Sequence, residues 1–388
     1  MKTILLAVSG SIAFYKAYEL ISLLKKEGFR VKVLLSQGVL KFGTRLSFEA
    51  LADEILCEDN ESWQNTNNHI AFSKTCDCVL FAPASINSIN KLNYGIADNL
   101  FIQTLIAVDK NKPFLIAPAA NTNMYLHFST QKSLKNLKEQ GYIIIDPIVK
   151  TLACKDEGLG ALAELDSIIN ALKRSLMQED FFKDKSFVIS GGGTKEKIDD
   201  VRCISNFSSG KMAKAIADAL YFLGAKVVLV SSVEFKAPYK LEKFESSLEL
   251  KEKLQKYKEF DALIMAAAVS DFTLEAYKGK IKKNEHLNGL DLKLKLNEDI
   301  LKNLDFKGKK IGFKMEFDAQ NALENAKKSL VSKNLDMVCL NVLNEQMNFG
   351  SDENSICFIT KDDSTSQSSK QSKEKLGFIL AQELRKLW

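Results

Sequence analysis

The sequence predicts an α/β protein of two domains, each built on a mostly parallel sheet wrapped by helices. Short apolar runs alternate with helical patterns along the chain, as is typical of parallel sheets. The same opening also occurs twice: Ile4–Val8 leads into Ser9-Gly10-Ser11, and Phe187–Ile189 leads into Ser190-Gly191-Gly192-Gly193-Thr194. Turns of small residues let backbone N–H groups approach a phosphate. We therefore expect a phosphate-bearing ligand, and a separate activity, in each half.

Length and composition limit the possible partners. At 388 residues the chain exceeds one ordinary core, since domains average roughly 100–200 residues. The net charge of +5 permits small anionic ligands, and no motif for nucleic acid is present, so we expect none as a partner. No stretch approaches the ~20 apolar residues of a membrane span. The seven scattered cysteines form no C-x-x-C pair, which predicts free thiols and a cytoplasmic location.

The first half reads as a series of strands separated by helices. A helical pattern, Ile12–Glu27, follows the first strand and stops at Gly28. The predicted strands are Ile4–Val8, Val31–Leu35, Cys78–Phe81, Pro113–Ala117 and Tyr142–Ile145. Ligands lie beyond the carboxyl ends of parallel strands. The segments that should gather at that edge are therefore Ser9–Ser11, Ser36, Pro83–Asn87 and Pro118–Asn121.

The second half repeats this alternation. The helical stretch Glu164–Gln178 and the acidic pair Glu179-Asp180 mark the boundary, giving domains 1–180 and 181–388. The predicted strands are Phe187–Ile189, Lys226–Val230, Ala262–Ala268, Ile311–Phe313 and Met337–Leu340, with helices at Lys211–Leu223 and Leu376–Trp388. The polar segment Lys361–Lys375 predicts a mobile surface loop.

Three residues of the first half are candidates for chemistry. His69 precedes a buried strand and is either a structural histidine or an acid/base group. Asn121 follows a strand and is either a helix cap or a neutral holder of a carboxylate. Cys154 lies among charges and glycines, where the neighbouring Lys155 favours a reactive thiol, although a buried inert thiol remains an alternative.

Candidates in the second half are cationic or amide side chains. Arg202, Asn206 and Lys211 suit an anionic phosphorylated ligand, with helix capping by the neighbouring serines as the alternative. The cluster Lys280-Ile281-Lys282-Lys283 either keeps an edge strand soluble or, beside Asp271, clamps a triphosphate. The fingerprint G-x-G-x-x-G is absent, which argues against a nicotinamide dehydrogenase.

Together these motifs resemble, over essentially the whole chain, the bifunctional family of coenzyme A biosynthesis. That family joins phosphopantothenoylcysteine decarboxylase to phosphopantothenate–cysteine ligase. The stretches that look like flavin-dependent cysteine decarboxylases are Ser9-Gly10-Ser11-Ile12-Ala13, Pro83–Asn87 and Pro118–Met124. Those that look like the ligase are Ser190–Lys211, Ala266–Asp271, Lys280–Lys283 and Lys333-Asn334-Leu335-Asp336.

For the first half, the resemblance implies a flavodoxin-like or Rossmann-like FMN domain that decarboxylates a cysteine conjugate. Oxidation of the substrate thiol to a thioaldehyde would create an electron sink beside the departing carboxylate. His69 matches the active-site histidine, Asn121 the carboxylate-binding asparagine and Cys154 the proton donor of the final reduction. The positions that match FMN contacts are Gly10, Ser11, Ile12, Ser36, Ser85 and Asn87.

For the second half, the resemblance implies a Rossmann-like ligase that uses CTP and Mg²⁺ to activate 4'-phosphopantothenate as an acyl-cytidylate, which the amine of L-cysteine then attacks. Asn206 matches the residue that handles this intermediate, and Lys280 the key lysine. The CTP positions are Ala266, Ala267, Asp271, Lys280, Asp299, Ile300, Phe313 and Lys333; the substrate positions are Arg202, Asn206 and Lys211. A homo-oligomer is implied, trimer-based for the decarboxylase half with sites between subunits, and dimeric for the ligase half.

Several residues depart from the family pattern. They are Ala120 for methionine, Tyr125 for tryptophan, Lys155 for glycine, Ala161 for arginine and Ser329 for lysine. Lys155 and Ala161 motivate one alternative, a working ligase with an impaired decarboxylase. A second alternative is a flavin-binding regulatory protein, against which the joint presence of His69, Asn121 and Cys154 argues.

Overall fold

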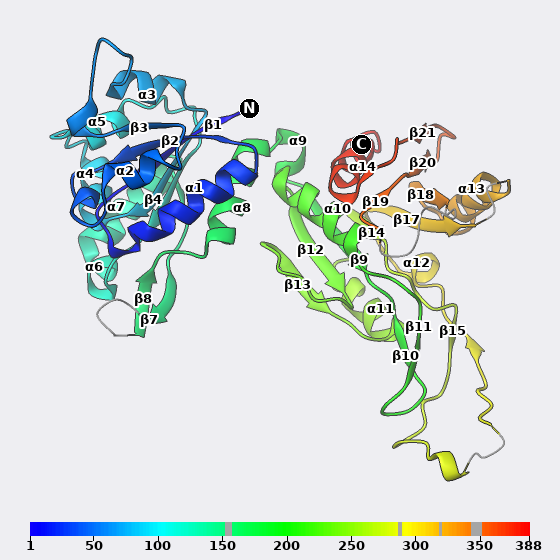
Figure 1. The fold of residues 1–388 in the computed structure, drawn as a ribbon. Helices are drawn as coiled ribbons and strands as arrows, with labels where there is room; N and C mark the ends of the chain where they lie inside the picture. Colours follow the sequence, from blue (N-terminus) through cyan, green and yellow to red (C-terminus); the bar gives the residue numbers. More distant parts are fainter. Residues whose placement is uncertain (152–156, 286–288, 318–319, 343–350) are drawn as a thin grey trace. The chain divides into compact units, whose positions relative to one another are not determined.

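The chain divides into two units, Met1–Leu176 and Met177–Trp388. The computed structural model describes residues 1–151, 157–285, 289–317, 320–342 and 351–388, drawn in sequence colours in Figure 1. The boundary expected after residue 180 would pass through α9 (Asp180–Lys183). Phe182 of this helix is fully buried in the core of the second unit. Within the described residues, none of the helices is both long and apolar enough to cross a bilayer.

The first unit is built on a six-stranded sheet in which every pairing is parallel. Its order is β3-β2-β1-β4-β5-β6. The bounds are β1 (Thr3–Val8), β2 (Arg30–Leu35), β3 (Glu54–Leu56), β4 (Cys78–Ala84), β5 (Phe114–Pro118) and β6 (Ile143–Ile144). From β1 the chain winds outward to β3, then returns to β4 and winds the other way. The strand order therefore reverses between β1 and β4, where α/β sheets bind ligands.

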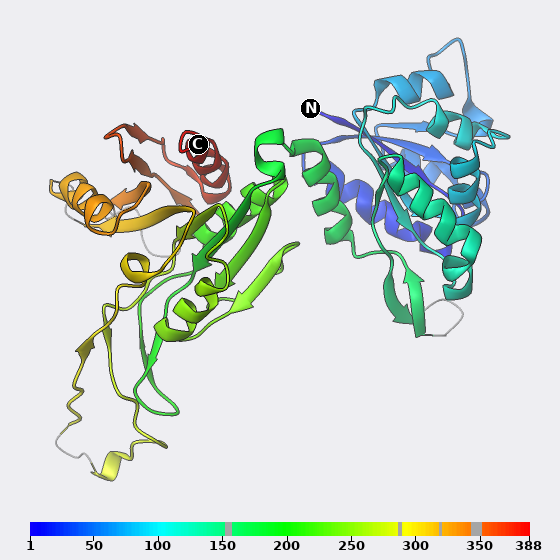
Figure 2. The ribbon, with the colours of Figure 1, turned by 180° about the vertical axis from the view of Figure 1, so that it is seen from behind.

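Helices cover both faces of this sheet, so β1 is apolar on both sides. Its Ile4 and Leu6 pack with α1 (Lys16–Lys26) and α8 (Leu165–Met177), whereas Leu5 and Ala7 face the opposite layer. Figures 1 and 2 show helices on both sides of the sheet. That layer consists of α3 (His69–Thr75), α4 (Ile86–Tyr94), α5 (Leu100–Ile106) and α7 (Phe128–Glu139). The remaining short helices are η1 (Ile12–Tyr15), η2 (Val39–Lys41), α2 (Arg45–Glu49), η3 (Glu58–Asn60) and α6 (Thr122–Leu126).

The second unit contains a mixed eight-stranded sheet in the order β13-β12-β9-β14-β17-β18-β20-β21. Pairings from β13 to β18 are parallel, and the last two are antiparallel. The bounds are β9 (Ser186–Gly191), β12 (Lys226–Ser231), β13 (Lys240–Lys243), β14 (Ala262–Met265), β17 (Lys309–Glu316), β18 (Met337–Val342), β20 (Cys357–Thr360) and β21 (Thr365–Gln367). The order again reverses beside the first strand, between β9 and β14. The predicted fold class, two α/β units on mostly parallel sheets, is confirmed.

Helices also cover both faces of the second sheet. On one face α10 (Lys211–Phe222) packs closely against α14 (Lys373–Arg385), where a Cβ on Gly377 would lie 2.4 Å from the carbonyl oxygen of Ala215. The opposite face is covered by α11 (Ser247–Gln255), α12 (Ile300–Asn303) and α13 (Ala322–Ser332).

The prediction of a mobile loop at Lys361–Lys375 is wrong. This segment contains β21, then β22 (Gln371–Ser372), which pairs with β19 (Glu353–Asn354), and the start of α14. The polar composition was misleading because β21 is the edge strand of its sheet, and an edge strand tolerates polar side chains on its open side. The strand predicted at Ala262–Ala268 also ends earlier, at Met265.

Two short antiparallel pairs extend the second unit beyond its sheet. They are β10 (Lys195–Lys197) with β11 (Cys203–Ser205), and β15 (Phe272–Thr273) with β16 (Lys295–Leu296). We call residues 195–205 and 272–285 the arm; Figures 1 and 2 show its two segments side by side. The 3-10 turn η4 (Lys283–Glu285) ends its second segment. A hydrogen bond from the Tyr277 N–H to the Ile198 carbonyl, 2.9 Å, joins the segments.

Candidate functional site

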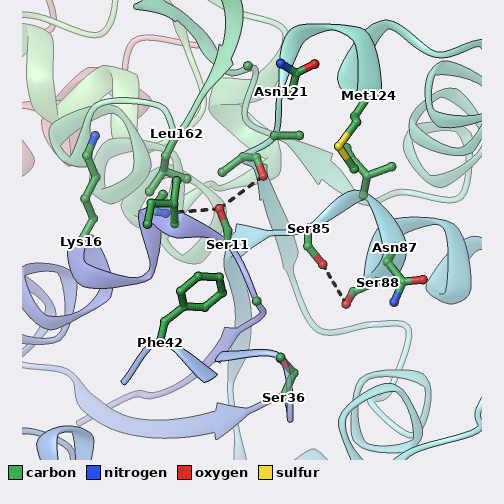
Figure 3. A pocket seen from close by; sticks show the side chains of 18 of the residues that line it. Ser11, Lys16, Ser36, Phe42, Ser85, Asn87, Ser88, Asn121, Met124 and Leu162 are labelled. Carbon is green, nitrogen blue, oxygen red and sulfur yellow. Dashed lines mark hydrogen bonds between the residues drawn. The ribbon is translucent and has the colours of Figure 1, made fainter. Parts of the chain in front are cut away.

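A cavity of about 1010 Å³ opens in the first unit at the carboxyl ends of β1, β2, β4 and β5 (Figure 3). The segments after each of these strands contribute to its lining, as their positions in the sequence predicted. All six positions matched to FMN contacts line it, together with one candidate catalytic residue: Gly10, Ser11, Ile12, Ser36, Ser85, Asn87 and Asn121. The cavity lies where the strand order reverses between β1 and β4, which is where such sheets usually bind ligands.

The ends of β1 and β4 are fixed to each other by one buried hydroxyl. Ser9 Oγ donates to the carbonyl oxygen of Pro83 (2.9 Å) and accepts from the N–H of Ser85 (2.7 Å). The next residue, Gly10, approaches the segment after β2 so closely that a Cβ would lie 2.8 Å from the carbonyl carbon of Gly38. Backbone rather than side chains therefore forms this part of the pocket wall, as close approach to a phosphate requires.

Ser36 supplies an unsatisfied polar atom to the pocket. Its Oγ is buried and has no hydrogen-bond partner within the described part of the chain. Buried polar groups are nearly always paired, because leaving one unpaired is costly. The neighbouring Ser11 and Ser85 have partners: Ser11 Oγ donates to the Ala119 carbonyl (3.4 Å) and Ser85 Oγ to Ser88 Oγ (3.1 Å). A polar ligand that lies against Ser36 would satisfy this hydroxyl.

Asn121 lines the pocket and also caps a helix, so both roles considered for it are compatible. Its Oδ1 accepts the N–H of Asn123 (2.9 Å) at the start of α6. The hairpin of β7 (Ile148–Thr151) and β8 (Glu157–Ala161) packs against the same loop. The Ala120 N–H donates to the Gly160 carbonyl (2.9 Å), and a Cβ on Gly160 would lie 2.3 Å from the Ala120 carbonyl oxygen.

Cys154 belongs to residues 152–156, between the two strands of this hairpin in the chain, and lies outside the described residues. The two departures that follow Cys154 in the chain differ in this respect, because Lys155 is also outside the described residues, whereas Ala161 lines the pocket.

His69 is not among the residues that line this pocket. It begins α3, where its Nδ1 lies 2.9 Å from Glu61 Oε1 and its ring meets the edge of Trp63 with centroids 5.4 Å apart. The two candidate catalytic residues His69 and Asn121 are therefore not brought together in one pocket of the first unit.

The sequence reasoning missed several residues of the pocket lining: Lys16, Gln37, Gly38, Phe42, Glu58 and Lys150. Gln37 and Gly38 directly follow Ser36 at a predicted strand end, so the topology argument could have included them. Phe42 carried no such signal, since it follows the short helix η2.

In the second unit, the reversal between β9 and β14 brings two candidate segments side by side. The Ala268 N–H donates to the Gly192 carbonyl (2.8 Å), and the Thr194 N–H donates to the Ala268 carbonyl (3.2 Å). Asn206 joins them, because its Nδ2 donates to the Val269 carbonyl at 3.1 Å. The stretch Ala266–Asp271 therefore runs beside the small-residue turn and beside Asn206.

Other candidate nucleotide positions extend from this edge along the sheet. The carbonyl oxygen of Asp271 accepts the N–H of Asn297 (2.8 Å), two residues before Asp299. Asp299 caps α12, and its Oδ2 lies 3.0 Å from Lys333 Nζ. Phe313 of β17 is partly buried, whereas the side chain of Ile300 is buried in the core, which leaves its backbone as the group available to a ligand.

Arg202 and Lys280 lie on neighbouring segments of the arm. Arg202 donates from Nη2 to the Ile281 carbonyl (3.1 Å), and its Nη1 lies 3.4 Å from Asp199 Oδ2. Lys280 is exposed in an irregular segment, so the edge-strand interpretation of its cluster is wrong. Lys211, in contrast, begins α10 and lies 2.6 Å from Asp352 Oδ1. Among the described residues, no cluster of three or more His, Cys, Asp or Glu side chains has the arrangement to hold a metal ion.

Comparison with known proteins gives the same division of the chain into two units. Residues 1–177 match the flavoprotein family model, and residues 182–387 match the DNA/pantothenate metabolism flavoprotein C-terminal domain. The coenzyme A biosynthesis bifunctional protein CoaBC of Bacillus subtilis is 36% identical over 400 residues, covering 100% of this chain and 97% of the relative. Its counterpart in Borreliella burgdorferi is 34% identical, covering 93% of each chain. That of Methanocaldococcus jannaschii is 35% identical, covering 93% of this chain and 88% of the relative. The chain therefore belongs to the family of coenzyme A biosynthesis bifunctional proteins.

Proposed function

We propose that the chain converts 4'-phosphopantothenate into 4'-phosphopantetheine in two steps, one in each unit. The second unit would join 4'-phosphopantothenate to L-cysteine with CTP, and the first would remove CO2 from the product. The observation that carries the proposal is that polar side chains gather in each unit where the strand order reverses, in a chain that matches bifunctional relatives over its full length.

The first pocket fits FMN. The close backbone approach at Gly10 offers N–H groups to a phosphate, and the unpartnered hydroxyl of Ser36 needs a polar partner. Ile12, Ser85 and Asn87 also line the pocket and would supply further contacts. When bound, FMN would supply a two-electron acceptor for the substrate thiol.

The chain's own residues would direct the decarboxylation. Asn121 would hold the substrate carboxylate with a neutral amide, which orients the group without stabilising its charge against loss of CO2. Cys154 would donate the proton that completes the product. No net oxidation results, since phosphopantothenoylcysteine gives 4'-phosphopantetheine and CO2.

The second unit must bring a carboxylate and a triphosphate together, so it needs positive charge. Arg202, Lys280 and Lys333 supply three cationic groups, and the amide of Asn206 would hold the acyl group. The carboxylate would attack the α-phosphate of CTP, giving an acyl-cytidylate and pyrophosphate. The amine of L-cysteine would then form the amide bond and release CMP. Mg²⁺ would bind chiefly through the nucleotide phosphates, the usual mode for this ion.

We further propose that the chain works as a homo-oligomer in the cytoplasm, trimer-based through the first unit and dimeric through the second. A site shared between copies would allow His69 of one copy to complete the pocket of another. Exposed large apolar side chains line that pocket (Ile12, Phe42, Met124) and lie on the second unit's extensions (Phe272, Leu296). Described cysteines are free thiols, in agreement with a reducing compartment.

The test is a single reaction followed by mass spectrometry. The purified chain receives CTP, Mg²⁺, 4'-phosphopantothenate and L-cysteine, and its visible spectrum is recorded for flavin. We expect a flavin spectrum, transient phosphopantothenoylcysteine and accumulating 4'-phosphopantetheine. Accumulation of phosphopantothenoylcysteine alone would indicate an impaired decarboxylase. Absence of any cysteine conjugate, with 4'-phosphopantetheine still formed from supplied conjugate, would refute the ligase proposal.

A further inference from the structure

The carboxylate of Asp199 is buried between the two segments of the arm, and both of its oxygens accept hydrogen bonds. Oδ1 accepts the N–H groups of Val201 (2.8 Å) and Arg202 (2.7 Å), while Oδ2 accepts the N–H of Ile281 (3.1 Å) and lies 3.4 Å from Arg202 Nη1. Burial by itself raises the pKa of Asp199, but the N–H groups of Val201, Ile281 and Arg202 outweigh it and hold this pKa below its ordinary value. The side chain is therefore an anion that joins two distant segments.

These bonds fix the backbone on the carboxyl side of Lys280, since Ile281 is its neighbour. On the amino side a second, more exposed connection exists, in which Asp200 Oδ2 accepts the N–H of Gly279 at 3.1 Å and the Asp200 N–H donates to the Gly279 carbonyl at 3.3 Å. Lys280 itself is exposed. A long lysine side chain has much rotamer freedom, so its reach depends on a fixed backbone.

We propose that Asp199 is a positioning residue of the ligase. It fixes the backbone segment that carries Lys280 next to the segment that carries Arg202. The inference rests on the proposed role of Lys280 in the CTP-dependent reaction. Asp199 touches neither substrate nor nucleotide in this role. Its hydrogen bonds hold the segment that carries Arg202 against the segment that carries Lys280, although both residues are cationic. Misplacement of a catalytic group by about 1 Å can reduce turnover roughly 100-fold.

The experiment compares two adjacent carboxylates in the full chain. Asp199→Asn keeps the shape but replaces one acceptor oxygen with a donor, so it can no longer accept every N–H. We expect a loss of roughly 10-fold to 100-fold in CTP-dependent formation of phosphopantothenoylcysteine. Asp200→Asn is the matched control and should change the rate by less than about two-fold, because water replaces an exposed hydrogen bond. Decarboxylation of supplied phosphopantothenoylcysteine should be unchanged in both variants.

A double-mutant cycle separates positioning from general structure. If Asp199 acts through Lys280, adding Asp199→Asn to a Lys280→Ala chain should cause no further loss of ligase rate. A loss that persists in full in the Lys280→Ala background would overturn the inference. Full ligase activity of Lys280→Ala alone would instead refute the proposed role of Lys280, which is a different result.

Amide hydrogen exchange tests whether Asp199 holds the two arm segments together, and it does so without an activity assay. In Asp199→Asn, amides of residues 277–283 should exchange faster while those of β9 and β14 keep their protection. Unchanged exchange at 277–283 would overturn the inference. If β9 and β14 also lose protection, the variant has unfolded the unit, and Asp199→Ser, which keeps a small hydroxyl acceptor, replaces it in every comparison.

Discussion

At the scale of single residues, one atom of the first unit's pocket points to a ligand. Ser36 Oγ is buried at a strand end without a hydrogen-bond partner in the described residues. A hydroxyl in this state weakens the folded protein and favours whatever ligand pairs with it. Its presence among backbone N–H groups and glycines is the feature that argues for a phosphate or a polyol.

Replacement of the Ser36 hydroxyl should change ligand affinity without changing the stability of the fold. For Ser36→Ala we expect FMN affinity to fall about five-fold, corresponding to the roughly 1 kcal/mol of one hydrogen bond, with no loss of stability in the flavin-free protein. Flavin fluorescence titration and thermal unfolding measure the two quantities. Ser73→Ala is the control, since Ser73 is buried but its Oγ donates to the Ile70 carbonyl (2.9 Å), so this variant should lose stability and keep its flavin affinity. Equal affinity of Ser36→Ala and the parent would contradict the assignment.

At the scale of elements, both sheets use the same device to fix the register of parallel strands. An aspartate just before one strand accepts an N–H near the start of its neighbour: Asp53 with Val31 (2.7 Å), Asp77 with Thr3 (2.6 Å), Asp261 with Ser186 (2.7 Å) and Asp336 with Lys310 (2.9 Å). Register matters because a slip of one residue would turn every side chain to the wrong face. These carboxylates therefore help to place the strand ends that carry the site.

Asp261 makes this device testable through pH. Burial raises its pKa, but the hydroxyl and N–H of Ser186 and the charge of Lys185 outweigh burial and lower that pKa below the ordinary value. A lowered pKa contributes stability above the unfolded value of roughly 3.9, and that contribution is lost as pH falls through the folded pKa. We expect Asp261→Asn to destabilise the second unit by about 1–2 kcal/mol at pH 7 and to reduce its loss of stability below about pH 4.

Thermal unfolding of the second unit between roughly pH 2 and pH 8 measures this effect. Asp305→Asn is the control, because Asp305 is exposed and should alter neither the stability nor its pH dependence. An Asp261→Asn profile parallel to that of the parent would contradict the role of the carboxylate.

The β7–β8 hairpin is a second element with a direct test. Gly160 has a φ of +152°, and a Cβ there would lie 2.3 Å from the Ala120 carbonyl oxygen, so alanine must push β8 away from the loop that carries Asn121. We expect Gly160→Ala to reduce decarboxylation of supplied phosphopantothenoylcysteine roughly 100-fold and to leave the ligase unchanged.

Gly95→Ala is the matched control for backbone strain. Gly95 also has positive φ, +67°, but a Cβ there would meet no atom within 4 Å. This variant should cost about 1 kcal/mol of stability and keep full activity. A decarboxylase that tolerates Gly160→Ala as well as Gly95→Ala would show that the hairpin contact is not needed.

At the scale of the whole molecule, each unit has its own hydrophobic layers on both faces of its own sheet. Cores of this kind generally unfold as independent cooperative units. We therefore expect calorimetry of the full chain to show two transitions, one raised by FMN and the other by CTP with Mg²⁺. Ligand at about 100 times its Kd should add about 2.7 kcal/mol to its own unit only. A single transition that both ligands raise together would contradict two independent sites.

Much of the fold could be predicted because strand and helix patterns are local. The runs that form β1, β4 and β5 are apolar on both faces, and β2 is apolar except for Arg30 and Lys32, a signal within a few consecutive residues. β3 was missed because it is a short edge strand of three residues. β21 and β22 were missed because their polar composition resembles that of a loop. Such strands are held by backbone pairing to a neighbour far along the chain, which composition does not record.

The sequence by itself determined the two parallel-sheet units, the small-residue turns at their first strands, and the side chains available there, because these depend on periodicity and residue type. Only the tertiary structure decided which of those side chains meet. It placed Ser36 in the same pocket as Gly10, left His69 outside the pocket that Asn121 lines, and joined Arg202 to the backbone beside Lys280 through Asp199. The physical reason is that such encounters depend on strand order and long-range hydrogen bonds, which follow from burial of the whole chain and not from any short stretch of it.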